Sequence, residues 1–323
     1  MSLPKLGIDV SKKTFKVALL RIDKIRQGTF DNNATGFGLL SSWLVKHGVT
    51  KVHAVMESTG VYGDALAEFL FDMDHQVSIV NPAQIHAFAQ SELSRTKTDR
   101  VDAAVIARFA RSHEPRPWQP PSAELRELQV LVRHREHLIK HRTQLSNRLT
   151  EGRLISSVAA SLEKLIAAVD EEIKSVEGQI REHIDKHPTL KSDVDLLTSI
   201  SGIANQTAVN LLAEISHLHD YKTSRQVIAY AGLSPRIKLS GTSVRGRPRL
   251  SKIGNPRIRK ALYWPAITAL KHNPTIRALG ERLEQRGKHS LVVIAAAMRK
   301  LLALAFGVLK SGKPFDENYA KTC

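Results

Sequence analysis

The first part of the chain takes its fold from Lys5-Leu6-Gly7-Ile8-Asp9-Val10 and the run after it, Thr14-Phe15-Lys16-Val17-Ala18-Leu19-Leu20. Apolar residues dominate both runs, as expected of strands whose sheet has helices to cover it. The Ser-Lys-Lys segment between them is short enough for a tight turn. The two runs therefore predict an antiparallel pair of strands.

The residues beyond this pair extend it into a mixed sheet. A third strand is predicted over residues 25–30, and the pattern then alternates between helix and strand, with helices over 37–46 and 64–73, strands over 51–56 and 76–80, and a helix opened by Asn81-Pro82. Thr98 is a suitable N-cap for a last helix from Asp99 to about Ser112. A three-stranded meander followed by alternating elements predicts a mixed α/β sheet covered by helices. This order is typical of RNase H-like nucleases, although other α/β folds share it.

A proline-rich segment predicts the first domain boundary. Four prolines stand between residues 115 and 121, and such a run cannot continue a helix. Two long helical patterns follow, over 123–149 and 158–184, and the second has apolar residues three and four apart, as in a coiled-coil seam. An intrachain helical hairpin and self-association both fit this spacing. The predicted domains are residues 1–114, 115–190 and 191–323.

The last of these domains is predicted to be mainly α. Residues 195–216 resemble a helix-hairpin-helix with Gly202 in its turn, an arrangement that aims backbone N–H groups at a DNA phosphate. A purely structural helix pair is the alternative. Further helices are predicted over 226–231 and from about Pro256, Pro274 and Ser290 onward.

Charge and composition restrict the partners. The formal net charge is +17 with a pI near 10.1, and residues 222–280 hold thirteen lysines and arginines but no acid. A like-charged cluster of this size predicts a polyanion as partner. A membrane is not expected, because the N-terminus lacks an apolar signal core and Arg299-Lys300 interrupt the most apolar segment. The single cysteine, Cys323, fits a reducing cytosol.

Four acidic residues stand where they could share a metal ion. Asp9 lies at the end of the first strand and Glu57 follows the strand over 51–56, while Asp99 and Asp102 share one face of a helix. Carboxylates at strand ends and on a helix can meet at one edge of a sheet. Oxygen-only ligands favour Mg²⁺ or Mn²⁺, and two such ions would stabilise the attacking and leaving oxygens of phosphoryl transfer.

The acid-free segment carries small hydroxyl residues among arginines, in residues 236–249. A serine there is a candidate nucleophile, because arginines can hold a scissile phosphate by paired hydrogen bonds. Ser240 and Ser243 are both candidates, and a basic loop that only grips DNA is the alternative. The residues predicted to contact nucleic acid are Arg236, Lys238, Arg245, Arg247, Arg249, Lys252, Arg257, Arg259 and Lys260.

Motifs along the whole chain resemble one family, the DEDD-type insertion-sequence transposases described as bridge-RNA-guided recombinases. The motifs are Gly7-Ile8-Asp9, Glu57-Ser58-Thr59-Gly60, Val80-Asn81-Pro82, Phe88-Ala89-Gln90-Ser91, Lys97-Thr98-Asp99-Arg100-Val101-Asp102-Ala103, Ala231-Gly232-Leu233-Ser234-Pro235, Ser240-Gly241-Thr242-Ser243-Val244-Arg245-Gly246, Ser251-Lys252-Ile253-Gly254-Asn255 and Arg259-Lys260-Ala261-Leu262-Tyr263. The chain departs from the family pattern at Ser201 and Ala204, where proline and glycine are common. That departure affects only the expected helix-hairpin-helix contact.

The resemblance implies a RuvC-like N-terminal domain, a coiled-coil insertion and a C-terminal transposase domain. It implies that Asp9, Glu57, Asp99 and Asp102 bind Mg²⁺ and that Ser240 forms a 5′-phosphoserine link to DNA. It also implies that the serine of one protomer meets the carboxylates of another, in a dimer or tetramer. The implied partners are donor and target DNA and a noncoding guide RNA, and the implied location is the bacterial cytoplasm at the nucleoid.

Three rival mechanisms remain open at the level of sequence. An RNase H-like, structure-specific endonuclease would use water and leave Ser240 as a bystander. A tyrosine nucleophile would be Tyr230 or Tyr263, both in the basic segment. A non-catalytic nucleic-acid-binding protein would use the carboxylates only structurally.

Overall fold

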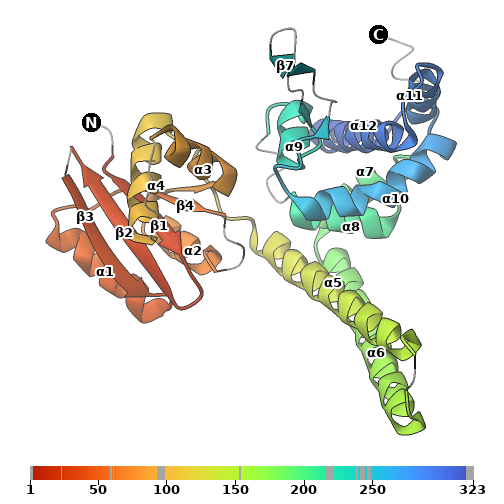
Figure 1. The fold of residues 1–323 in the computed structure, drawn as a ribbon, viewed down its shortest axis with the longest axis horizontal. Coiled ribbons are helices and arrows are strands. Elements are labelled where there is room, and N and C mark those ends of the chain that lie inside the picture. The colour runs from red at the N-terminus through yellow and green to blue at the C-terminus, as the bar shows by residue number, and fades with distance from the viewer. Residues whose placement is uncertain are drawn as a thin grey trace. The chain divides into compact units, whose positions relative to one another are not determined.

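The computed structural model divides the chain into two compact units, Met1–Pro120 and Pro121–Cys323 (Figure 1). It describes residues 3–22, 24–58, 60, 62–92, 99–152, 154–215, 221–236, 239–240, 244–245 and 249–317, without the side chains of 99–101, 239–240 and 244–245. Each unit is presented by itself below.

The first unit is built on a five-stranded sheet with the order β3-β2-β1-β4-β5. Its strands are β1 (Lys5–Val10), β2 (Thr14–Arg21), β3 (Lys24–Asp31), β4 (His53–Glu57) and β5 (Gln76–Val80). The first three strands form an antiparallel meander, whereas β4 and β5 run parallel to β1. The structure thus confirms the predicted mixed sheet.

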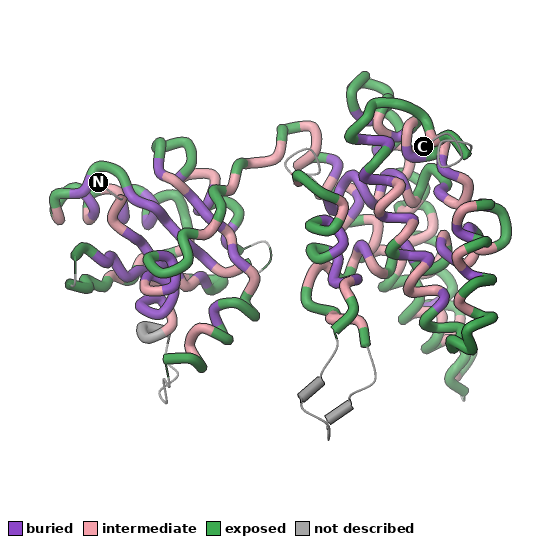
Figure 2. The backbone as a smooth tube through the Cα atoms, turned by 90° about the horizontal axis from the view of Figure 1, so that it is seen from above, coloured by how far each residue is buried: buried purple, intermediate pink, exposed green. Residues whose placement is uncertain are grey.

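Helices cover both faces of this sheet, because its strands are apolar on both sides. The helices are α1 (Ala34–Lys46), α2 (Asp64–Asp72), α3 (Pro82–Ser91) and α4 (Asp99–His113). Leu6 and Ile8 of β1 belong to the core that α1 and α2 complete, while Val55 of β4 packs with Val105 and Ile106 of α4. In Figure 2 the buried residues of this unit, in purple, lie inside it, with green exposed segments around them.

A chain of polar contacts ties the start of the proline segment to this sheet. Buried His53 lies 3.1 Å from the Lys5 ammonium and 2.8 Å from the Ser78 hydroxyl. That hydroxyl donates to the carbonyl oxygens of Pro115 and Arg116 at 3.0 and 2.8 Å. The segment after residue 114 is therefore held on the first unit by specific hydrogen bonds.

The second unit begins with a long antiparallel helical hairpin. Helices α5 (Ala123–Thr150) and α6 (Ser156–Lys186) contact each other along their length. The ion pairs Arg135–Glu177 and Arg142–Asp170, both at 2.6 Å, fix the opposite directions of the two helices. This is the intrachain alternative that the spacing left open, and self-association through the same segment stays a prediction.

The remaining helices pack around one core, with the base of the hairpin among them. They are α7 (Pro188–Thr198), α8 (Asn205–Glu214), α9 (Ser224–Tyr230), α10 (Pro256–His272), α11 (Pro274–Gln285) and α12 (Ser290–Ser311). Gly202, in the turn between α7 and α8, has a φ of +108°, and a Cβ there would lie 2.7 Å from that of Ala269. The predicted helix pair exists, and its contact with a DNA phosphate stays a prediction.

Four short strands lie between α9 and α10. Strand β6 (Pro235–Arg236) pairs with β9 (Arg249–Leu250), and β7 (Leu239–Ser240) pairs with β8 (Val244–Arg245), both antiparallel. We call residues 235–250 the serine ribbon. Its strands were not predicted from the sequence.

Candidate functional site

Two of the four predicted acids lie side by side at one edge of the sheet. Ile8 of β1 pairs in parallel with Met56 of β4, and Asp9 and Glu57 are the next residue of each strand. Successive side chains in a strand alternate between faces, so Asp9 projects to the face of Gly7, and Glu57 to the face of Val55. Both acids are partly buried.

Helix α4 covers this same face, and its direction places the other two acids. A Cβ on Gly7 would clash with the backbone of Ala103 and Ala107, so α4 crosses β1 in direct contact at this glycine. At the far end of the helix, Glu114 pairs with Lys5 at 3.7 Å. Helix α4 therefore runs opposite to β1, and its first turn lies toward Asp9.

That first turn carries the remaining two acids. Asp102 is partly buried and precedes Ala103 directly, while Asp99 is the first residue of α4 and its side chain lies outside the described residues. Strand ends and helix start thus bring the backbone of all four acids to one end of the first unit. The prediction of a shared carboxylate edge is consistent with this placement.

An oxygen-only donor set of this kind suits a hard divalent cation. Among the side chains that the structure describes, no three acidic, histidine or cysteine side chains form a metal-binding group. Asp9 and Glu57 each make a hydrogen-bond or electrostatic contact, as does Lys16, which the register places directly opposite Asp9 on β2. Sequence reasoning missed this lysine, although the predicted hairpin of β1 and β2 could have suggested it.

Ser240 stands in the inner part of the serine ribbon. It ends β7 and pairs with Val244 of β8 in an antiparallel register. The side chain of Ser240 and all of residues 241–243, including the alternative nucleophile Ser243, lie outside the described residues. The structure therefore places only the backbone of Ser240, in the pair of β7 and β8.

The ribbon rests on a closely packed base. Gly254 has a φ of +140°, and a Cβ there would lie 2.7 Å from the backbone nitrogen of Gly232. The backbone N–H of Asn255 donates to the Tyr230 carbonyl at 2.8 Å. Only glycine combines this conformation with such close backbone contact. Gly254 and Asn255 therefore fix the point at which the chain passes from the serine ribbon into α10.

The nine predicted nucleic-acid contacts fall into three groups. Arg257 and Lys260 pair with Glu136 of α5 at 3.2 and 2.7 Å, and Arg259 donates to the carbonyl oxygens of Ala231, Gly254 and Asn255. These three cations therefore have contacts within the chain, and their contact with nucleic acid stays a prediction. Arg236, Arg249 and Lys252 are described near the ribbon base, whereas Lys238 and Arg247 and the side chain of Arg245 lie outside the described residues.

A buried carboxylate that the sequence reasoning missed joins the hairpin to the ribbon base. Glu214 is 4% exposed and accepts hydrogen bonds from Arg133 of α5 at 3.1 Å and from Asn255 at 2.8 Å. Asn255 in turn caps α10 by accepting from the Arg257 backbone N–H at 2.9 Å. The available signal was that Glu214 is the last glutamate before the acid-free segment.

Of the tyrosines considered as nucleophiles, Tyr230 is 42% exposed. Desolvation of its phenol raises the pKa above the ordinary value, and the nearby Glu214 carboxylate acts in the same direction, against a hydrogen bond with Asn255. A raised pKa reduces the fraction of phenolate at neutral pH. Tyr263 packs edge-on against Trp264 with ring centroids 5.5 Å apart.

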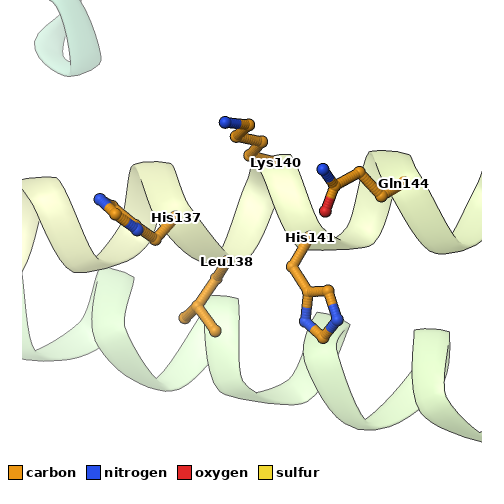
Figure 3. A pocket seen from close by; sticks show the side chains of 5 residues that line it. All are labelled: His137, Leu138, Lys140, His141 and Gln144. Carbon is orange, nitrogen blue, oxygen red and sulfur yellow. The ribbon is translucent and has the colours of Figure 1, made fainter.

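A shallow hollow on α5 offers another group of polar side chains (Figure 3). It has a volume of about 380 Å³ and is lined by His137, Leu138, Lys140, His141 and Gln144. In Figure 3 the five side chains stand on one face of α5, with Lys140 pointing up and Leu138 and His141 pointing down. All five residues come from one helix, so the hollow does not enclose a ligand.

Comparison with known proteins identifies the family. Residues 6–152, which contain all four predicted acids, match the family model DEDD_Tnp_IS110, described as "Transposase". Residues 194–281, which contain Ser240, match the model described as "Transposase IS116/IS110/IS902 family".

Two relatives and one solved structure illustrate the similarity. The chain is 34% identical over 321 residues to the pilin gene-inverting protein of Moraxella bovis, covering 98% of this chain and 99% of that one. It is 26% identical over 330 residues to the transposase for insertion sequence element IS1111A of Coxiella burnetii, covering 90% and 86%. T. thermophilus RuvC in complex with Holliday junction substrate aligns to 36% of this chain and 99% of its own, with 15% identity. Its TM-score of 0.26 is too low to establish a shared fold. The full-length similarity and both family matches show that the chain belongs to the IS110 family of transposases and is a DNA transposase or recombinase.

Proposed function

We propose that this transposase cleaves and rejoins DNA strands through a covalent serine–DNA intermediate, with Ser240 as the nucleophile. Asp9, Glu57, Asp99 and Asp102 would hold Mg²⁺ or Mn²⁺. The observation that supports this most is the position of the four acids, since β1, β4 and the start of α4 bring them to one edge of the sheet. Residues 222–280, which include the serine ribbon, contain no acid, so the proposed nucleophile and the proposed metal ligands come from different parts of the chain.

In the proposed reaction the Ser240 hydroxyl attacks the scissile phosphorus, and the bond from phosphorus to the 3′ oxygen breaks. The product is a 5′-phosphoserine and a free 3′ hydroxyl, to which the serine proton is finally transferred. Divalent cations bound to the acids would supply charge stabilisation at the attacking and leaving oxygens. Attack of another 3′ hydroxyl on the phosphoserine reverses these steps and joins new strands without ATP.

The chain's own contribution is to hold the phosphate beside the serine. Residues 222–280 contain no acid that would repel it. Arg236 and Arg249 face each other across the β6–β9 pair at the base of the ribbon, and Lys238, Arg245 and Arg247 lie further along it. Arginine donors in such an arrangement can neutralise the phosphate and the transition state.

The family resemblance supplies the rest of the proposal. The serine of one protomer serves the carboxylates of another, in a dimer or tetramer, so assembly controls cleavage. A noncoding guide RNA pairs with donor and target DNA, and base pairing rather than the protein reads the sequence. The expected location is the bacterial cytoplasm at the nucleoid.

A denaturing gel tests the mechanism. The protein is incubated with Mg²⁺, labelled DNA that contains the element ends, and RNA transcribed from the noncoding sequence beside the gene. We expect a covalent protein–DNA band that Ser240→Ala abolishes and that Ser243→Ala and Tyr263→Phe retain. Asp9→Asn should abolish the band while salt-sensitive DNA binding persists.

Three results would contradict the proposal in different ways. Cleavage without a covalent band indicates a water-using, RuvC-like or RNase H-like endonuclease. A band that survives Ser240→Ala but not Ser243→Ala assigns the nucleophile to Ser243. Binding with neither band nor cleavage indicates a non-catalytic nucleic-acid-binding protein.

A further inference from the structure

Helix α12 is more apolar than its burial requires. Its sequence is apolar enough to cross a membrane, with a mean hydropathy of 2.1, yet only 44% of that segment is buried. Val293, Leu301 and Leu302 enter the core, whereas Leu291 is 60% exposed and Val292 48% exposed. Large apolar residues uncovered together on one helix indicate a binding surface.

These exposed residues form one wall of a groove in the second unit. The groove has a volume of about 910 Å³ and lies where α12 meets α9, α11 and the base of the serine ribbon. Its apolar surface comes from Ile228, Leu233, Leu250, Leu279, Leu291 and Val292. Ala295 and Ala296 of α12 also line the groove, and their small side chains leave space beside the helix.

Cations are set among this apolar surface on several sides. They are Arg225 of α9, Arg249 of β9, Lys252 of the loop before α10, and Arg299 and Lys300 of α12. Among the described residues that line the groove, none is acidic. The groove therefore combines an apolar floor of several leucines with five positive charges, and its occupant must match both properties.

The apolar surface and the positive charges together favour one of three possible occupants of the groove. A second copy of the chain, docked through the same face, would bring ten of these cations together and repel itself. Nucleic acid satisfies the charges, but a single strand finds no aromatic ring for stacking among the described lining residues, and the backbone of a duplex gains nothing from leucine. An amphipathic helix with leucine-like residues on one face and carboxylates beside them satisfies both.

We propose that this groove binds an acidic amphipathic helix of a partner protein. Apolar residues spaced three and four apart would lie along α12 against Leu291 and Val292, and flanking carboxylates would pair with Arg225, Arg299 and Lys300. Because β9 belongs to the serine ribbon, the partner would contact the segment that carries the nucleophile. Such a partner would be able to regulate or recruit the enzyme without occupying the carboxylate edge.

A fluorescence anisotropy titration of the full chain tests this. The probe is a labelled synthetic helix with leucines at helical spacing and glutamates next to them. Two matched probes replace the leucines with glutamine or the glutamates with lysine. We expect saturable binding of the first probe, and binding at least ~10-fold weaker for each of the others.

Substitutions then locate the binding. Val292→Asp and Arg299→Glu change partly exposed groove residues and should each weaken binding ~10-fold or more. Arg286→Glu, at an exposed position outside the groove, should leave binding unchanged. Circular dichroism melts confirm that all three variants fold.

Several outcomes would overturn the proposal. Equal binding of the glutamine probe, or equal loss with Arg286→Glu, would show simple attraction to a basic protein. Absence of saturable binding excludes such a partner. Absence of probe binding together with dimerisation that Val292→Asp abolishes identifies a second copy as the occupant, and duplex DNA binding that Val292→Asp and Arg299→Glu weaken identifies nucleic acid.

Discussion

Replacing Gly7 with alanine should displace α4, which carries two of the four acids, while the rest of the first unit keeps its fold. The added Cβ would lie 2.9 Å from the Ala107 Cα and closer still to the Ala103 carbonyl oxygen. Both are backbone atoms of α4, so trimming a side chain cannot relieve the clash and the whole helix must move. Overpacking of this kind costs about 1–3 kcal/mol of unfolding free energy.

The same movement should have a larger effect on catalysis. Asp99 and Asp102 belong to α4, and a displacement of roughly 1 Å at a catalytic group can cost on the order of 100-fold in rate. We therefore expect Gly7→Ala to lower the rate of covalent adduct formation about 100-fold, while salt-dependent DNA binding, which depends on the basic residues of the second unit, stays near wild type.

Urea denaturation and a quantitative adduct assay measure the two effects. Gly38→Ala in α1 is the matched control, because a Cβ there meets nothing within 4 Å. In a helix this change should stabilise by about 0.5–1 kcal/mol and leave the rate unchanged. A Gly7→Ala enzyme with wild-type stability and rate would refute the close contact between α4 and β1 and the role assigned to it.

Three further substitutions probe both units. Glu214→Ala should lower the unfolding free energy by about 3 kcal/mol, because this buried carboxylate accepts from both Arg133 and Asn255 and both lose that hydrogen bond. Glu177→Ala, at a carboxylate that is 38% exposed, should cost less than ~1 kcal/mol in the same denaturant titration. Burial, with the nearby Lys5 ammonium, lowers the pKa of His53 to about 4. Between pH 6.5 and 4 the unfolded chain therefore binds a proton that the folded chain does not, so stability should fall by up to ~1.4 kcal/mol per pH unit on acidification and level off below pH 4. A pH series of urea midpoints should show this slope in the wild type, and an equal slope in His53→Gln would exclude it. Gly254→Ala should lower the melting temperature by several degrees, as its φ of +140° and close backbone contacts predict, whereas Gly178→Ala in an open helical position should raise it slightly.

Much of the first unit could be predicted because its signals are local. The strands carry continuous apolar runs and the helices begin at capping residues such as Asn81, whose side chain accepts from the Ala83 N–H. Once β1 and β4 are recognised as parallel neighbours, Asp9 and Glu57 must end at the same edge. The position of the first turn of α4 at this edge could not be predicted in the same way. It depends on the contact of Gly7 with Ala103 and Ala107, which are distant in sequence.

In the second unit, local sequence patterns did not predict the short strands or the partners of the charged residues. Strands of two residues, such as β6 and β9, are too short to show any periodicity. For Arg257, Arg259 and Lys260 the sequence displays the charge but not the groups within the chain that each cation contacts, and their contact with nucleic acid stays a prediction. Their partners are Glu136, which precedes Arg257 by 121 positions, and backbone carbonyls of the ribbon base.

The direction of the α5–α6 hairpin has a mechanical consequence. From Arg133, where the hairpin is fixed to Glu214, to the end of α5 at Thr150 the helix spans about 25 Å at 1.5 Å per residue. A stiff rod of this length is a lever, so a tilt of about 10° at its base moves its tip by roughly 4 Å. Conversely, a modest force on the tip exerts a large torque at Arg133 and Glu214. Asn255 links that same carboxylate to the start of α10. A ligand bound at the tip of the hairpin can therefore displace Glu214 and Asn255, and with them the base of the serine ribbon.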